Sequence, residues 1–446
     1  MRSMNCKRIA ALLLPAAIWL GVPALSAAEA APAAEQVYRM PTGQVKLSEL
    51  SVPPVVRLVD PKASEETGKL YAYLNGLRAS KYLLYGQQIK EPEDAARWGK
   101  QRKQGVVQDD PAIVMLDLHV FGKLLHEKQV NGGKKPLTFF QAEKKAKAEL
   151  MNYAAAWNER EILQGLSVDP PNFALVQEKG KVNETWDYSD DTSHVLTEGL
   201  VPRILPGGDL NPVFTGYLDL AANYAQMLQE KGIPVVFYPY PESSSEHVWW
   251  GKTGCSDAEF RNLYRYTVEY LRDVRQVHNL LYVYTLGKDV EGGAIDPRYP
   301  GDAFVDLQEL PMILYPGDSG RMVATSEYQL LSASHAADYR GLKVTRKDAA
   351  PQYGYFLTPA ANDIRPSTKL RAKVAGSPRE VRFVAYDTEG QPVCEKRGME
   401  DADRIYYAVF TKADLKPIGA VKGRIDLLAD GICMDSLQVS FWPTVK

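Results

Sequence analysis

Short apolar runs alternate with longer amphipathic stretches through most of the chain before residue 360. The runs short enough to be strands are 82–88, 111–117, 161–167, 235–238, 279–284, 304–307 and 312–315. Between them, helical periodicity is clearest at 144–157 and 258–274. Strands and helices alternating at these lengths predict an α/β fold with a parallel sheet. No glycine-rich fingerprint follows the first run, which disfavours a dinucleotide-binding fold.

The pattern changes near residue 367. The β-rich runs there are 370–374, 381–386, 404–410, 423–428 and 436–441, with turn residues such as Asp430-Gly431 between them. Such a pattern predicts a small antiparallel β-sandwich. We therefore assign residues 67–365 to the α/β domain and 366–446 to the sandwich. The sandwich either binds carbohydrate or only packs against the larger domain. The charged stretch 173–216 is expected to be a long irregular insert.

The N-terminus has the features of a secretory signal. A basic start precedes the apolar segment 9–20, and small residues follow up to Ala30. We expect residues 1–30 to be a signal peptide and 31–66 a linker and N-terminal extension. The apolar segment is too short for a transmembrane helix, although a retained anchor is the alternative. A secreted or periplasmic protein without stable membrane insertion is therefore expected.

Charge and cysteine content narrow the functional classes. The chain has 53 Lys and Arg against 55 Asp and Glu, so nothing suggests binding to nucleic acid. Export implies an oxidising compartment, where Cys394 and Cys433 are placed to pair within the sandwich. Cys255 would then remain a lone buried thiol. No Cys/His spacing is typical of zinc, so neither a metal nor another cofactor is expected.

The stretch 235–306 carries the candidate chemistry. Its first apolar strand ends in a short proline-containing segment and Glu242, and a polar loop then leads to Trp249-Trp250-Gly251. In a parallel α/β barrel, residues that follow the strands form the active face. A carboxylate beside indoles suits sugar cleavage, which needs an acid and flat apolar surfaces. Since adjacent residues point in opposite directions on a strand, at least one tryptophan should meet solvent or ligand.

This stretch resembles glycoside hydrolase family 26, whose best-known members are β-mannanases. In that family the strand reads Arg-Pro-x-His-Glu, and six residues separate its Glu from Trp-Trp-Gly. The resemblance implies a (β/α)8 TIM-type barrel with Glu242 as general acid/base. Segment 322–327 resembles the strand that ends in the nucleophile, which implies Glu327. Tyr299 to Asp302 match a Tyr-Pro-Gly-Asp motif of the family, so Tyr299 and Asp302 are candidates for substrate binding together with Trp249 and Trp250. The alternative is a structural turn that Pro and Gly fix and Asp caps. Segment 353–357 resembles the last barrel strand.

Several positions depart from the family pattern. Tyr238 stands in place of Arg, Pro241 in place of His, and Asp169 in place of the His that ends the third strand. Glu246 is a rival for the acid. We therefore expect a retaining glycoside hydrolase that cleaves a β-linked, mannan-like polysaccharide. The alternatives are a degenerate barrel that binds an exported polysaccharide without cutting it, and a purely structural exported scaffold.

Overall fold

The computed structural model describes most of the chain beyond residue 49. The described residues are 50–94, 110–183, 185–285, 296–315, 329–333, 337–346, 354–356, 363–364, 368–374, 378–402, 404–415 and 423–441. The expected signal peptide and the candidate nucleophile Glu327 both lie outside them, so these two predictions stay predictions.

A parallel sheet organises the larger domain. Its strands are β2 (Tyr82–Ile89), β3 (Ile113–Asp117), β4 (Leu163–Val168), β7 (Val235–Pro239), β8 (Leu280–Tyr284), β9 (Leu307–Gln308), β10 (Met312–Tyr315) and β11 (Gln329–Leu331). The order is β10-β2-β3-β4-β7-β8-β9, with β11 also paired to β2. Every pairing in this sheet is parallel. All of these strands except β11 lie at or near the positions predicted from the apolar runs, and the barrel-type α/β fold is confirmed. The strand expected at 322–327 lies outside the described residues.

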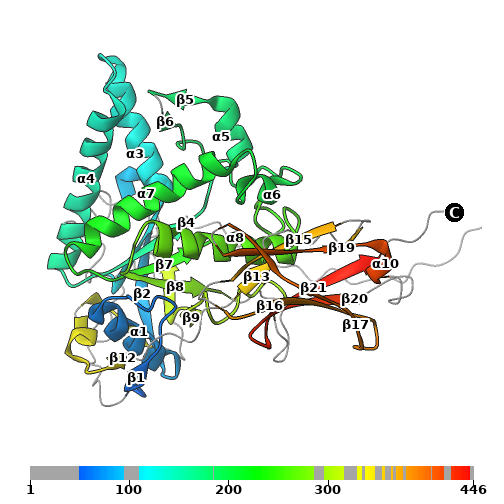
Figure 1. The fold of residues 1–446 in the computed structure, drawn as a ribbon. Coiled ribbons are helices and arrows are strands. Elements are labelled where there is room, and N and C mark those ends of the chain that lie inside the picture. The colour runs from blue at the N-terminus through cyan, green and yellow to red at the C-terminus, as the bar shows by residue number, and fades with distance from the viewer. Residues whose placement is uncertain are drawn as a thin grey trace, which may run out of the picture. The chain divides into compact units, whose positions relative to one another are not determined.

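Helices cover the sheet between successive strands (Figure 1). They are α1 (Glu65–Arg78), α3 (His119–Val130), α4 (Phe139–Glu159), α5 (Phe173–Lys179), α6 (Leu200–Ile204), α7 (Asn211–Gln229) and α8 (Asp257–Glu269), with a π-helical turn at Tyr270–Val274. Short 3-10 turns lie at Asn131–Gly133 and Ala337–Gly341, and short strand pairs are β1 (Val55–Val56) with β12 (Thr345–Arg346), and β5 (Lys181–Val182) with β6 (Thr185–Trp186). The charged insert is therefore less irregular than expected, because it contains α5, β5, β6 and α6.

Capping residues determine where two of the helices begin. Thr138 and Gln141 form a capping box, so α4 starts earlier than its apolar periodicity predicted. Ser256 and Glu259 form a second one at α8: the Ser256 hydroxyl accepts from the Glu259 amide at 3.3 Å, and the Glu259 carboxylate accepts from the Ser256 amide at 2.8 Å. Each box satisfies amide groups that a helix leaves unpaired at its start.

Both faces of the parallel sheet are buried. On β7, Val235 and Phe237 belong to the hydrophobic cluster formed with the helices, whereas Val236 belongs to a second cluster that contains Leu281 and residues of α1. Burial on both faces explains why the strands appear in the sequence as continuous apolar runs rather than as alternating ones.

The C-terminal strands form two sheets with a shared core. They are β13 (Gly354–Phe356), β14 (Asp363–Ile364), β15 (Thr368–Val374), β16 (Val381–Tyr386), β17 (Pro392–Arg397), β18 (Met399–Ala402), β19 (Ile405–Phe410), β20 (Gly423–Ala429) and β21 (Ile432–Phe441), with a short helix α10 (Lys412–Leu415). The sheet orders are β13-β15-β19-β18 and β14-β21-β20-β16-β17. All pairings are antiparallel except β14 with β21, so the expected antiparallel module is present.

Two predictions about this region were wrong. Segment 353–357 was expected to be the last barrel strand, but β13 pairs antiparallel with β15, and Phe356 packs against Phe383 in the sandwich core.

Cys394 and Cys433 lie on β17 and β21, which β16 and β20 separate. Three strand spacings are roughly 14 Å, and a disulfide tolerates at most about 7 Å between Cα atoms. Both thiols are free.

Cys255 is a free, buried thiol, as expected. Burial raises its pKa to about 11, so it stays protonated at neutral pH. Among the residues that the structure describes, no helix has the length and apolar character needed to cross a bilayer. The same residues contain no group of His, Cys, Asp and Glu side chains arranged to hold a metal ion.

The cap of α8 provides a test of the fold. We expect Ser256→Ala to lower the free energy of unfolding by about 1 kcal/mol, because it removes the hydroxyl that accepts from Glu259. Ser256→Thr keeps that hydroxyl and is the control. Urea unfolding followed by circular dichroism measures both variants. Equal midpoints for the alanine variant and the wild type would contradict the role of the cap.

Candidate active site

Glu242 lies just beyond the carboxyl end of β7, where the barrel fold places active residues, and it is exposed. Its backbone has a positive φ of 56°, and so does that of Tyr240. Non-glycine residues in this region cost of order 1–3 kcal/mol and persist only where the surrounding structure imposes them. The turn that carries Glu242 must therefore be held from outside.

Hydrogen bonds hold this turn on both sides of Glu242. The Tyr240 amide donates to the Val168 carbonyl at 3.0 Å, which links the turn to β4. The Ser245 amide donates to the Glu242 carbonyl at 2.7 Å. The Trp250 indole donates to the Pro241 carbonyl at 2.8 Å. The backbone of Glu242 is thus fixed, while its carboxylate has no hydrogen-bond partner among the described residues.

The two tryptophans are buried, with 0% of Trp249 and 1% of Trp250 exposed. The expectation that one of them meets solvent or ligand was wrong. The loop folds back over the helices, so Trp249 packs on Phe173 and Trp250 on Tyr240. The two indoles meet edge to face, with ring centroids 5.3 Å apart. Neither has an open face for a sugar ring in this structure.

A buried arginine holds the far end of the same loop. Arg298 is 2% exposed, and its guanidinium donates to the carbonyls of Trp250 at 2.6 Å and Cys255 at 3.1 Å. It also lies over the Phe260 ring, 4.5 Å from the centroid. Arg298 could not be predicted from the sequence, since nothing in its local sequence marks an arginine that will be buried.

Charged side chains gather at the carboxyl ends of the neighbouring strands β2, β3 and β4. The Lys90 ammonium lies 3.3 Å from an oxygen of Asp169, and the carboxyl groups of Asp117 and Asp169 lie close enough for each to shift the pKa of the other. Burial, together with the charge of Asp169, raises the pKa of Asp117 well above its usual value. Burial also raises the pKa of Asp169, and Lys90 opposes this rise. Asp117 therefore keeps its proton to a higher pH than an ordinary aspartate does.

Glu242 belongs to this cluster. Burial is the main cause of the raised pKa of Asp169, and contacts with Lys90 and Asp117 oppose it. The negative charge of Glu242 makes a smaller contribution that also raises this pKa. The Glu242 backbone amide also contacts the Tyr238 hydroxyl. The rival acid Glu246 is exposed on the same loop, but Glu242 is the one linked to Asp169. Lys90 and Asp117 were not predicted as site residues, although Asp117 ends one predicted strand and Lys90 lies two residues beyond another.

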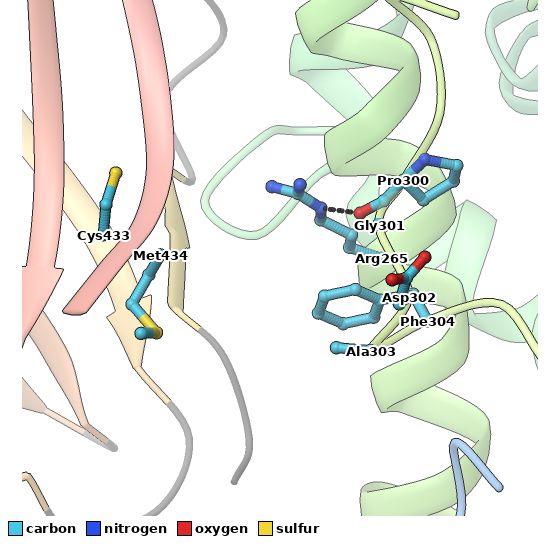
Figure 2. Close-up of a pocket in the computed structure, with 8 residues that line it drawn as sticks. All are labelled: Arg265, Pro300, Gly301, Asp302, Ala303, Phe304, Cys433 and Met434. Carbon is cyan, nitrogen blue, oxygen red and sulfur yellow. Dashed lines mark hydrogen bonds between the residues drawn. The ribbon is translucent and has the colours of Figure 1, made fainter. Parts of the chain in front are cut away.

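Tyr299 and Asp302 form a turn rather than a site with Glu242. The Tyr299 hydroxyl donates to the Asp302 carboxylate at 2.7 Å, and the Tyr299 ring packs on Tyr284. Asp302 lines a cavity of about 230 Å³ together with Arg265, Pro300, Gly301, Ala303, Phe304, Cys433 and Met434. Figure 2 shows Arg265 donating to the Pro300 carbonyl beside this cavity. Glu242 does not line it.

Comparison with known proteins points to one family. The family model of glycosyl hydrolase family 26 matches residues 59–319. A mannan endo-1,4-beta-mannosidase of Bifidobacterium adolescentis is 42% identical over 126 residues, which cover 27% of this chain and 12% of that protein. The mannan endo-1,4-beta-mannosidase A and B of Caldalkalibacillus mannanilyticus is 24% identical over 264 residues, covering 57% of this chain and 46% of that protein.

A solved structure extends the similarity of the fold. The structure of an endo-beta-1,4-mannanase double mutant from Cellulomonas fimi has a TM-score of 0.63 and 19% identity, and the match covers 87% of this chain and 100% of that chain. At this identity the likeness supports the fold alone. The aligned stretches of the two sequence relatives span less than half of those proteins' own length.

The raised pKa of Asp117 predicts a dependence of stability on pH. Because the pKa of Asp117 is raised in the folded protein, its contribution to stability is complete below the ordinary Asp value of about 4 and is lost as the pH rises above it. Asp117→Asn has a neutral side chain at every pH, so the variant does not lose this stability as the pH rises. We expect the melting temperature of the variant to improve relative to wild type as the pH rises above about 5.

Thermal unfolding at several pH values measures this effect. Glu178→Gln neutralises an exposed carboxylate and is the control, with a difference from wild type that stays constant over the same range. An equally constant difference for Asp117→Asn would mean that Asp117 is ionised in the folded protein.

Proposed function

Because the chain belongs to glycosyl hydrolase family 26, we propose that it is a glycosidase that cleaves a β-linked, mannan-like polysaccharide, with Glu242 as general acid/base. The observation that carries this proposal is the place of Glu242. It is exposed at the carboxyl end of a barrel strand, on a strained and firmly held turn, beside a carboxyl cluster. The names of the sequence relatives support mannan as the class of substrate.

The proposed chemistry uses two carboxyl groups and retains the configuration of the sugar. Glu242 gives a proton to the glycosidic oxygen as the bond breaks, and its carboxylate later takes a proton from the attacking water. Glu327 is the proposed nucleophile, which attacks the anomeric carbon from about 5 to 5.5 Å away from the acid. Like charges repel each other, so the negative charge of Glu242 contributes to the raised pKa of Asp169.

A second candidate function is glycan binding without cleavage. Three positions around Glu242 favour it, since Tyr238, Pro241 and Asp169 replace the Arg and the two His of the family pattern. Each replacement removes a basic group next to the acid. In either case we propose a secreted or periplasmic protein, on the basis of the signal-like residues 1–30.

Neutralising Glu242 tests the proposed activity. Glu242→Gln should lower the rate of release of reducing ends from mannan or glucomannan by about 10²-fold to 10⁴-fold, because general acid catalysis typically contributes that much. Glu246→Gln, on the same loop, is the matched control and should retain the wild-type rate.

The outcomes separate the two candidates. A normal rate for Glu242→Gln on a substrate that the wild type cleaves would remove Glu242 from the mechanism. A wild-type protein that binds mannan in affinity electrophoresis but releases no reducing ends would favour glycan binding without cleavage.

A further inference from the structure

We propose that Trp249 and Trp250 are positioning residues that together set the spacing between the acidic side chains of Asp169 and Glu242. This inference rests on the proposed function, because it assigns a role in the same site. It replaces the sugar-stacking role expected from the sequence, since both indoles are buried.

Each indole N–H donates to a proline carbonyl next to one of the two acids. Trp250 Nε1 donates to the Pro241 carbonyl at 2.8 Å, and Pro241 directly precedes Glu242. Trp249 Nε1 donates to the Pro170 carbonyl at 3.0 Å, and Pro170 directly follows Asp169. The two acids lie on different loops, one after β4 and one after β7. The consecutive tryptophans therefore connect the loops through equivalent bonds.

Proline makes these anchor points stiff. Its ring fixes φ near −65° and it has no N–H, so the carbonyl is the sole backbone group that can hold it by a hydrogen bond. A displacement of the Pro241 or Pro170 carbonyl therefore moves the neighbouring acid by a similar amount, because the stiff proline absorbs little of the displacement. This matters most at Glu242, whose positive φ already requires outside support.

The tryptophan pair is itself rigid. The rings meet edge to face at an interplanar angle of 87° with centroids 5.3 Å apart. The Trp249 amide donates to the Ser193 carbonyl at 3.1 Å, and the Trp250 carbonyl accepts from Arg298 at 2.6 Å. The pair thus has anchors outside both acidic loops and can serve as a fixed reference for them.

Removing one N–H at a time tests this role. Trp250→Phe and Trp249→Phe keep an aromatic ring and lose the bond to the proline carbonyl. Trp157→Phe is the control, because Trp157 is a buried indole at the end of α4 with 3% exposure. Melting temperature, kcat and KM are measured with aryl β-mannobiosides that carry either a good or a poor leaving group.

A misplaced acid has a distinct kinetic signature. A good leaving group departs without a proton, whereas a poor one needs Glu242 in place. We expect Trp250→Phe to lower kcat about 10-fold to 100-fold for the substrate with the poor leaving group, which is the cost of a displacement near about 1 Å. KM, and the kcat for the substrate with the good leaving group, should change little. Trp249→Phe should show a smaller loss of the same kind. The double variant should lose less than the sum of the two effects, because the indoles act as a unit.

Several results would overturn the inference. Equal losses with both leaving groups, or a lower melting temperature with unchanged kinetics as for Trp157→Phe, would mean that the tryptophans only pack. If Trp250→Phe does not fold, 3-benzothienylalanine at position 250 keeps the bicyclic shape and removes only the N–H, and the same comparison applies. A wild-type protein that cleaves neither substrate overturns the proposed function, and this inference with it. An active wild type whose Trp250 variants behave like Trp157→Phe overturns the inference alone.

Discussion

The buried guanidinium of Arg298 is the interaction on which the candidate site most depends. Taking an arginine out of water costs several kcal/mol unless its donors find partners. Its partners are the carbonyls of Trp250 and Cys255, the carboxylate of Asp257 and the face of Phe260. All of them come from the loop after β7 or from the start of α8. These contacts form only when this loop adopts the fold that carries Glu242, so the burial of Arg298 is linked to that fold.

A chain of hydrogen bonds connects Arg298 to the segments that carry the two acids. Arg298 holds Trp250, Trp250 holds the carbonyl next to Glu242, and Trp249 holds the carbonyl next to Asp169. The Glu242 carboxylate itself stays exposed, while its backbone is confined to a strained conformation. This division suits a group that must meet a substrate, since the scaffold restrains the main chain and leaves the side chain accessible.

Helix α8 connects the barrel to the C-terminal module. Arg265 on α8 donates to the Asp435 carboxylate at 2.8 Å, and the same carboxylate accepts from the Phe356 amide at 3.1 Å. Lys373 of β15 lies 3.2 Å from Glu269 near the end of α8. Arg265 and Asp435 are both largely buried, so removing either partner alone would leave an uncompensated charge. These contacts explain why β13 joins the sandwich, because Phe356 lies at Asp435.

The sequence by itself determined the features that depend on local pattern. Apolar runs placed most of the parallel strands, helical periodicity located α4 and α8, and the strand end before Glu242 identified the candidate acid. Only the tertiary structure decided the burial of Trp249 and Trp250, the contact between Asp117 and Asp169, and the separation of Cys394 from Cys433. Each of these depends on which distant segments meet. Strand order and loop packing arise from the whole chain, and no local spacing of residues encodes them.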